Sequence, residues 1–206
     1  MSQHELDLTT ISASSAVFSL RNEFEINAPA SYVFSLFSDI STWPSWNTLN
    51  PNPQVVTHGL DNQNQGSIIA VNNAQLITGP NGPQLQATPT TLREGTIFNI
   101  PNSVPKSGFS SFATFLCYHV DAEERSAAWI YYSEMNPTPK ALLEVERATR
   151  VVDLGGGRCK FESLERQTGL KAAYVKVRYA KSLQKAFDAQ AQPLKKYTEA
   201  KYNETK

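Results

Sequence analysis

The chain has no excess of charge of either sign. It contains 19 Lys and Arg and 19 Asp and Glu in 206 residues, so its formal net charge is zero. A neutral chain lacks the long-range field that draws in nucleic acid or anionic headgroups. We therefore expect no nucleic-acid partner and no insertion into a membrane.

Cysteine is scarce, and long apolar runs are absent. Cys117 and Cys159 are the only cysteines, and both lie in apolar, strand-like segments. We expect two small buried thiols, with a disulfide only if their strands are neighbours. Residues 1–10 lack the apolar core of a signal peptide, and no run reaches the length of a membrane span. These absences favour a reducing, cytoplasmic compartment.

Histidine is rare too, with His4 in the polar start of the chain and His58 and His119 in or beside predicted strands. His58 or His119 could act as a general base near neutral pH. Their spacing is not that of metal ligands, and no cluster of Cys and His exists, so we expect no metal and no cofactor. No helix follows Gly155-Gly156-Gly157, which predicts a hairpin turn rather than a phosphate loop.

The residues that are present suit a sizeable core. Hydrophobic residues make up 40% of the chain and aromatic residues 10%. We expect a flexible polar tail over residues 1–14 and a single domain over residues 15–206. Within that domain, residues 50–91 are rich in Asn, Gln, Pro and Gly around short apolar runs. This composition predicts strands joined by an extended loop region that is mobile or forms a cavity entrance.

The apolar periodicity changes twice along the chain. Alternation over Val17–Ile26 predicts a half-buried strand, and Pro29 then opens a short helix to about Asp39. A second short helix or turn is predicted over Ile40–Asn47. Strands with short turns follow, and they predict an antiparallel sheet: Gly95–Ile100, Phe109–Val120, Ala127–Ser133, Leu142–Leu154 and Arg158–Gln167.

The last segment has a helical period. It predicts one long amphipathic helix that begins at Thr168 or Gly169 and is kinked or weakened by Pro193. Its apolar stripe includes Leu170, Tyr174, Val177, Leu183 and Phe187. The fold class is therefore α+β, with a curved antiparallel sheet wrapped around a long C-terminal helix and two short helices after the first strand. A curved sheet that grips one helix tends to leave a cavity between them.

This order and several motifs resemble the SRPBCC superfamily, the START and Bet v 1-like helix-grip fold. The motifs are Phe24-Glu25-Ile26-Asn27-Ala28-Pro29 with Val33-Phe34, Asp39 and Trp43-Pro44-Ser45-Trp46-Asn47; Leu92-Arg93-Glu94-Gly95-Thr96-Ile97-Phe98; and Gly155-Gly156-Gly157-Arg158 with Glu165 and Gly169-Leu170. The resemblance covers about Val17 to Tyr202, and residues 50–91 depart from it by their length. It implies lipid carriers, hormone receptors, quinone-binding proteins or polyketide aromatase/cyclases, among which fold alone does not choose.

Strand parity marks a candidate catalytic group. If Leu143, Val145 and Val151 face the core, Arg147 faces it as well, and Ser163 and Glu165 do so on the partner strand. An inward charge is costly unless it is paired. Arg147 therefore either polarises a carbonyl or enolate, with Glu165 as partner or base, or forms an ion pair with Glu165 that fixes the sheet under the helix.

Aromatic residues on the predicted strands and the long helix are either cavity walls or plain core. The candidate ligand-binding residues, with Ser163, are Phe112, Tyr118, Trp129, Tyr131, Tyr174, Val177 and Phe187. A buried Tyr hydroxyl needs a partner, which a ligand could supply. Trp43 and Trp46 are expected to pack the short helices, with a place at the cavity mouth as the alternative.

Three functions fit this pattern. The first is a cofactor-free cyclase or dehydrase of a small hydrophobic metabolite, with a polyketide synthase product as candidate substrate and aldol or lactone (pyrone) ring closure as reaction. The second is a carrier or sensor of a lipid, quinone or isoprenoid, which predicts a wholly apolar cavity. The third is a chaperone cofactor, which predicts a filled core and an exposed apolar patch. Each is compatible with a monomer or a homodimer.

Overall fold

The computed structural model describes the backbone of residues 6, 8–48, 50, 52–58, 70–71, 74–79, 82–87, 90–103, 110–132 and 138–206; side chains at 57–58, 70–87, 101–103 and 110–112 lie outside that description. In chain order the elements are β1 (Phe18–Ile26), α1 (Ala30–Ser38), the 3-10 helix η1 (Ile40–Ser45), β2 (Gln54–His58), β3 (Ala70–Val71), β4 (Ala74–Gly79), β5 (Gly82–Ala87), β6 (Thr96–Ser103), β7 (Ser110–Asp121), β8 (Ser126–Tyr131), β9 (Glu144–Gly155), β10 (Arg158–Thr168), α2 (Leu170–Asp188) and α3 (Ala191–Asn203).

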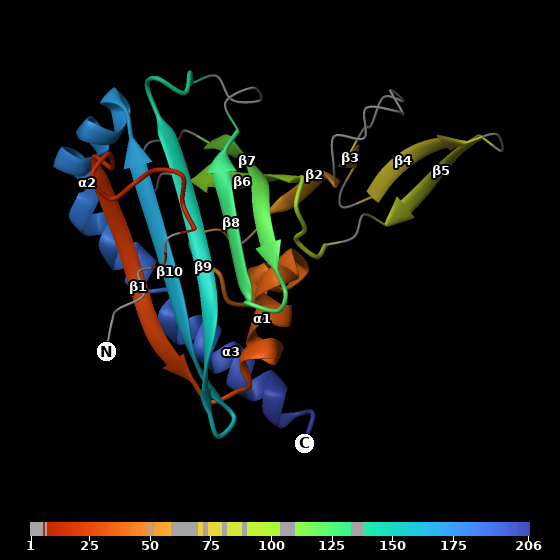
Figure 1. Ribbon diagram of the computed structural model, residues 1–206. Coiled ribbons are helices and arrows are strands. Elements are labelled where there is room, and N and C mark those ends of the chain that lie inside the picture. Colours follow the sequence, from red (N-terminus) through yellow and green to blue (C-terminus); the bar gives the residue numbers. More distant parts are fainter. Residues whose placement is uncertain are drawn as a thin grey trace.

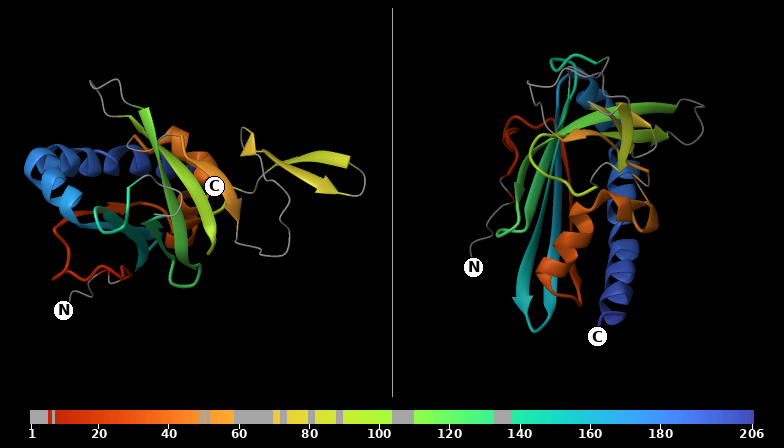
Figure 2. Two further views of the ribbon diagram at one scale, coloured as in Figure 1. Left: turned by 90° about the horizontal axis from the view of Figure 1, so that it is seen from above. Right: turned by 90° about the vertical axis from the view of Figure 1, so that its right-hand side faces the viewer.

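Seven strands form one antiparallel sheet in the order β1-β10-β9-β8-β7-β6-β2. The helices lie against one face of it, with α2 behind β1 and α1 beside α3 (Figures 1 and 2). This arrangement confirms the predicted α+β fold class. Cys117 on β7 and Cys159 on β10 are buried free thiols. Because β8 and β9 separate their strands, the conditional disulfide does not form.

The side chains of the hairpin of β9 and β10 face the sides of the sheet that the sequence predicted. Arg147 lies opposite Glu165, and Thr149 lies opposite Ser163. The turn between the strands needs glycine, because Gly155, Gly156 and Gly157 all have positive φ angles, of 75°, 62° and 73°. On this hairpin the odd-numbered side chains therefore face the helices, and the even-numbered side chains face the other way.

The C-terminal helix is bent rather than continuous. Predicted as one helix kinked at Pro193, it breaks instead at residues 189–190, between α2 and α3. Pro193 lies in the first turn of α3, where its missing N–H leaves no hydrogen bond unmade. The predicted covering stripe is also partly wrong. Phe187 is fully buried, but Tyr174 is 62% and Val177 89% exposed, because α2 turns its other side to β1.

The described part of residues 1–14 packs on the sheet, where the sequence predicted a loose tail. Leu6 and Ile11 are buried, and the backbone N–H of Ile11 donates to Glu146 Oε2 at 2.8 Å. Arg166 Nη1 donates to the carbonyl of Ile11 at 2.9 Å. Glu146 and Arg166 belong to the sheet face opposite the helices, so this polar segment shields charges that would otherwise be solvated.

The predicted extended loop region contains strands, as expected. β2 joins the main sheet, whereas β3, β4 and β5 form a separate three-stranded sheet to one side of it (Figure 1). The predicted mobility at residues 62–66 and 79–83 falls largely outside the described residues.

Candidate functional site

A small cavity lies between the concave face of the sheet and the helices. Its lining comes from β1, α1, η1, β8, β9, β10, the α2–α3 break and α3. The lining residues are Asn22, Phe24, Phe37, Trp43, Trp46, Asn47, Trp129, Arg147, Phe161, Ser163, Gln190 and Leu194. The space open to the centre of a water molecule is about 10 Å³, which is room for about one water. The core around it is therefore well filled.

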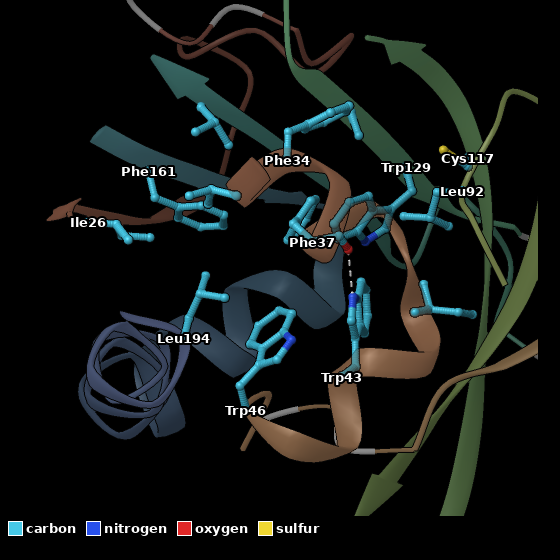
Figure 3. Close-up of a cluster of buried hydrophobic side chains, with 14 of the residues drawn as sticks. Ile26, Phe34, Phe37, Trp43, Trp46, Leu92, Cys117, Trp129, Phe161 and Leu194 are labelled. Carbon is cyan, nitrogen blue, oxygen red and sulfur yellow. Dashed lines mark hydrogen bonds between the residues drawn. The ribbon is translucent and has the colours of Figure 1, made fainter. Parts of the chain in front are cut away.

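Six of the twelve residues that line the cavity are aromatic. Trp43 and Trp46 point from η1 and its end toward Phe37, with Leu194 facing them from α3 (Figure 3). Trp43 Nε1 donates to the carbonyl of Phe37 at 2.8 Å, which fixes the ring where a buried N–H needs a partner. The Trp129 ring packs against Phe37 with centroids 6.0 Å apart. Trp43 and Trp46 pack the short helices, as predicted, and they also line the cavity.

The other end of the cavity is polar. Arg147 Nη2 donates to Gln190 Oε1 at 2.8 Å, and Gln190 Nε2 donates to Asn47 Oδ1 at 2.8 Å. Since a guanidinium only donates, it fixes the orientation of the Gln190 amide. Arg147 Nε also reaches Ser163 Oγ at 3.3 Å. The chain of hydrogen bonds joins β9, the helix break and the end of η1.

Arg147 is a buried cation without an ion-pair partner. It is 7% exposed, and burial lowers the pKa of its guanidinium, which nearby Glu165 partly offsets. Within the described part of the chain no carboxylate lies within 4.0 Å of it. Glu165 instead accepts a hydrogen bond from Gln167 at 2.7 Å. The Phe187 ring, 4.5 Å from Arg147 Cζ, and the Trp129 ring, at 5.8 Å, supply π faces to the cation.

Two donors at this polar end are unused. Among the described residues, Arg147 Nη1 and Asn47 Nδ2 have no hydrogen-bond partner, and neither atom is fully enclosed. Both residues line the cavity. An oxygen atom of a molecule in the cavity could accept hydrogen bonds from them.

The structure brings together only part of the predicted site. Arg147, Ser163 and Trp129 line the cavity. Phe187 lies behind Arg147, and Glu165 faces the same side of the sheet but is not part of the lining.

His119 and Tyr118 are on the wrong face for the predicted roles. A bulge between Cys117 and His119 pairs His119 with Ala128, whose side chain packs on the outer face. There His119 Nε2 lies 2.9 Å from Ser126 Oγ, and the Tyr118 hydroxyl donates to the carbonyl of Leu8 at 2.7 Å.

Three other predicted ligand contacts lie away from the cavity. Tyr174 and Val177 are exposed on α2 and do not line the cavity. Tyr131 faces the same side as Trp129 but packs beyond the cavity, against Phe115. The side chains of His58 and Phe112 lie outside the description, so their predicted roles stay predictions.

Three amides were missed by the sequence prediction. Asn22 Nδ2 donates to the carbonyl of Phe187 at 2.8 Å, beside the cavity. Its inward face follows from the parity of Phe24 and Ile26, a signal already present in the sequence. Asn47 and Gln190 carry no such periodicity, because each lies where a helix ends.

Among the described residues, no group of three or more His, Cys, Asp or Glu side chains lies close enough together to hold a metal ion. In the same part of the chain, no helix is both long and apolar enough to cross a membrane.

The fold is the Bet v 1-like helix-grip fold that the sequence motifs resemble. No protein-family model and no curated protein matches the sequence. Among solved structures, the hypothetical protein jhp0584 of Helicobacter pylori is 16% identical, with 91% of this chain and 92% of that chain covered and a TM-score of 0.62. Ara h 8.0201 is 12% identical over 88% and 97% of the two chains, with a TM-score of 0.53.

The di-domain ARO/CYC protein BexL, from the BE-7585A biosynthetic pathway, also matches. It is 12% identical, with 86% of this chain but 46% of that chain covered and a TM-score of 0.50. At these identities the matches establish a shared fold, and the function has to be argued from the site.

Proposed function

We propose that the protein binds a small hydrophobic molecule in this cavity and holds one of its oxygen atoms on Arg147. The observation that carries the proposal is the buried guanidinium, which has no carboxylate partner among the described residues. A buried charge without a counter-charge is unfavourable, and a carboxylate, enolate or carbonyl oxygen of a ligand would compensate it. The aromatic wall suits the apolar remainder of such a molecule.

A ligand larger than water requires the lining to open. The cavity admits about one water, so side chains such as Trp46 and Leu194 must move outward. Leu194 belongs to α3, directly after the helix break at residues 189–190. Opening at this break needs no change in the sheet that carries Arg147.

The chemistry that this arrangement favours is cofactor-free ring closure or dehydration, as of a polyketide. In lactone formation, the enol oxygen attacks a thioester carbonyl carbon, the C–S bond breaks, and the thiol leaves with the enol proton. Arg147 would hold the oxyanion of the tetrahedral intermediate. Arg147 is the one ionisable side chain in the described lining. Proton removal therefore relies on the acidity of carbon between two carbonyl groups in the substrate.

A carrier or sensor of a lipid, quinone or isoprenoid is the second candidate. The lining is not the wholly apolar one expected for a carrier, but it holds no carboxylate or imidazole to serve as base among the residues described, and this favours the carrier. The polar end would then fix the orientation of a ligand carbonyl rather than activate it.

Binding is tested with a matched pair of probes, 3-phenylpropionate and 3-phenylpropanol, by isothermal titration calorimetry. The proposal expects the carboxylate to bind at least about tenfold more tightly than the alcohol, since a charge-assisted hydrogen bond contributes about 1.5–3 kcal/mol. Arg147→Met should abolish this preference. Arg150→Met, three residues along the same strand but on its other face, should keep it. Equal affinities of both probes in the wild type would refute the proposal.

Turnover separates the two candidates. The N-acetylcysteamine thioester of 3,5-dioxohexanoic acid releases a thiol when it closes to a pyrone, and thiol release is readily followed. A cyclase should accelerate release, and Arg147→Met should lower the rate by about a hundredfold or more, as when one oxyanion donor is lost. Tight binding of 3-phenylpropionate without any acceleration would instead favour the carrier.

A further inference from the structure

The first half of α2 presents apolar side chains to solvent. Leu170 is 75%, Tyr174 62% and Val177 89% exposed. Their spacing along the helix puts them on one stripe, opposite the half-buried Val175. Leu142, also exposed, lies beside the start of this stripe, where its carbonyl accepts from the N–H of Lys171 at 2.9 Å. Exposed apolar side chains grouped in this way mark an interaction surface.

Positive charge surrounds this stripe. Between Leu170 and Phe187 the helix carries five basic residues and no acidic one, the basic residues being Lys171, Lys176, Arg178, Lys181 and Lys185. Residues 170–206 hold nine of the 19 Lys and Arg but three of the 19 Asp and Glu. The zero net charge of the chain therefore conceals a strongly polarised molecule, with a basic C-terminal part and an acidic remainder.

These cations are not engaged by carboxylates of the protein. In the described part of the chain none of the five forms an ion pair. Lys171 Nζ donates to Thr138 Oγ1 at 2.9 Å and Lys176 Nζ to the carbonyl of Val17 at 2.8 Å. Arg178, Lys181 and Lys185 project into solvent.

We propose that this face of α2 docks on the surface of a membrane that contains anionic lipid. An apolar stripe bordered by Lys and Arg is the pattern of helices that lie in the plane of a membrane interface. The lipid phosphates would neutralise the cations, and Leu170, Tyr174 and Val177 would enter the boundary of the acyl chains. α2 lies along one side of the molecule, so its convex surface can approach a flat one (Figure 2).

A second copy of the chain fits this face less well. A two-fold contact would set the same surface against itself. The five basic residues of the helix would then be brought close to the five of its copy, without any acidic residue of the helix before Asp188 to offset them. Anionic lipid is the complementary occupant.

The test is flotation with vesicles of phosphatidylcholine alone and with about 30 mol% phosphatidylserine, at about 0.1 M salt. The wild type should float only with the anionic vesicles and should be released by high salt. Lys181→Gln/Lys185→Gln should lower the partition coefficient about 25-fold, at about fivefold for each charge near the surface. The control variant Lys196→Gln/Lys201→Gln on α3 removes the same number of charges. It should lower the partition coefficient by about twofold or less.

The apolar stripe is tested separately with Tyr174→Ser/Val177→Ser. Both side chains are exposed, so the folded structure is retained while vesicle binding falls by about tenfold or more. Equal binding to neutral and anionic vesicles, or equal loss in both lysine pairs, would overturn the proposal. The proposal would also be overturned if the wild type bound no vesicles and instead formed a dimer in light scattering that Val177→Glu converts to a monomer.

Discussion

Replacing Arg147 by methionine tests whether this residue is present for ligand binding although it lowers the free energy of unfolding. The substitution removes the hydrogen bonds to Gln190 at 2.8 Å and Ser163 at 3.3 Å. Leaving the Gln190 oxygen unpaired costs about 1–3 kcal/mol. Removing an unpaired buried charge also removes its desolvation penalty of several kcal/mol, and the methionine side chain fills a similar volume. We therefore expect a free energy of unfolding within about 1 kcal/mol of the wild type, or higher.

Arg150→Met is the matched comparison on the same strand. Arg150 donates to Glu162 Oε2 from Nε at 3.1 Å and Nη2 at 2.7 Å, and Glu162 is 4% exposed. Arg150 lies on the sheet face away from the helices, yet it holds a buried carboxylate whose other ion-pair partner among the described residues is Lys160. We expect this variant to lose about 1–3 kcal/mol.

Urea unfolding followed by tryptophan fluorescence measures both variants, with m-values checked for constancy. All three tryptophans, Trp43, Trp46 and Trp129, lie in the core and report its loss. The reasoning fails if Arg147→Met loses about 3 kcal/mol or more, as a broken buried pair would, while keeping its preference for 3-phenylpropionate. Arg147 would then be a structural residue.

Three further predictions concern packing, backbone and pH. Phe187→Ala should cost about 3–5 kcal/mol in urea unfolding, because the ring is fully buried; a loss under about 1 kcal/mol would mean a poorly packed site. Gly169→Ala should cost clearly more than Gly156→Ala, since a Cβ at Gly169 would lie 2.6 Å from a backbone oxygen whereas Gly156 has open space; equal costs would contradict the clash. Burial raises the pKa of Cys117 to about 12 and of Cys159 to about 11, so the folded protein keeps protons that unfolded thiols lose from about pH 8.5. Stability measured in urea should therefore fall as the pH rises from about 9 toward 12, and Cys117→Ala/Cys159→Ala should show a smaller fall.

The faces of the central hairpin could be predicted from the sequence because a strand has a period of two. That period alone predicts that Arg147 and Ser163 point inward, and both side chains line the cavity. The rule does not extend to His119, because a bulge between Cys117 and His119 shifts the register by one residue. A bulge leaves no clear mark in apolar alternation, so the face of His119 could not be predicted from the sequence.

The helix prediction failed for a related reason. The apolar period runs through residues 189–190 without interruption, so periodicity does not mark the break between α2 and α3. The break directs the side chain of Gln190 inward, where it joins Arg147 to Asn47. Polar side chains at helix ends are positioned by tertiary packing, which periodicity alone does not report.

The pairing of the first strand with the last has a consequence for the synthesis of the chain. β1 is an edge strand whose neighbour is β10, with Phe18 beside Gln167 and Ile26 beside Cys159. At about 5–20 residues per second, the ribosome needs on the order of ten seconds to supply that neighbour. Until then the apolar side of β1 has no place in the sheet, and neither the helices nor the cavity can close. The nascent chain therefore carries an unprotected strand through most of its synthesis, which makes it a candidate client for ribosome-associated chaperones.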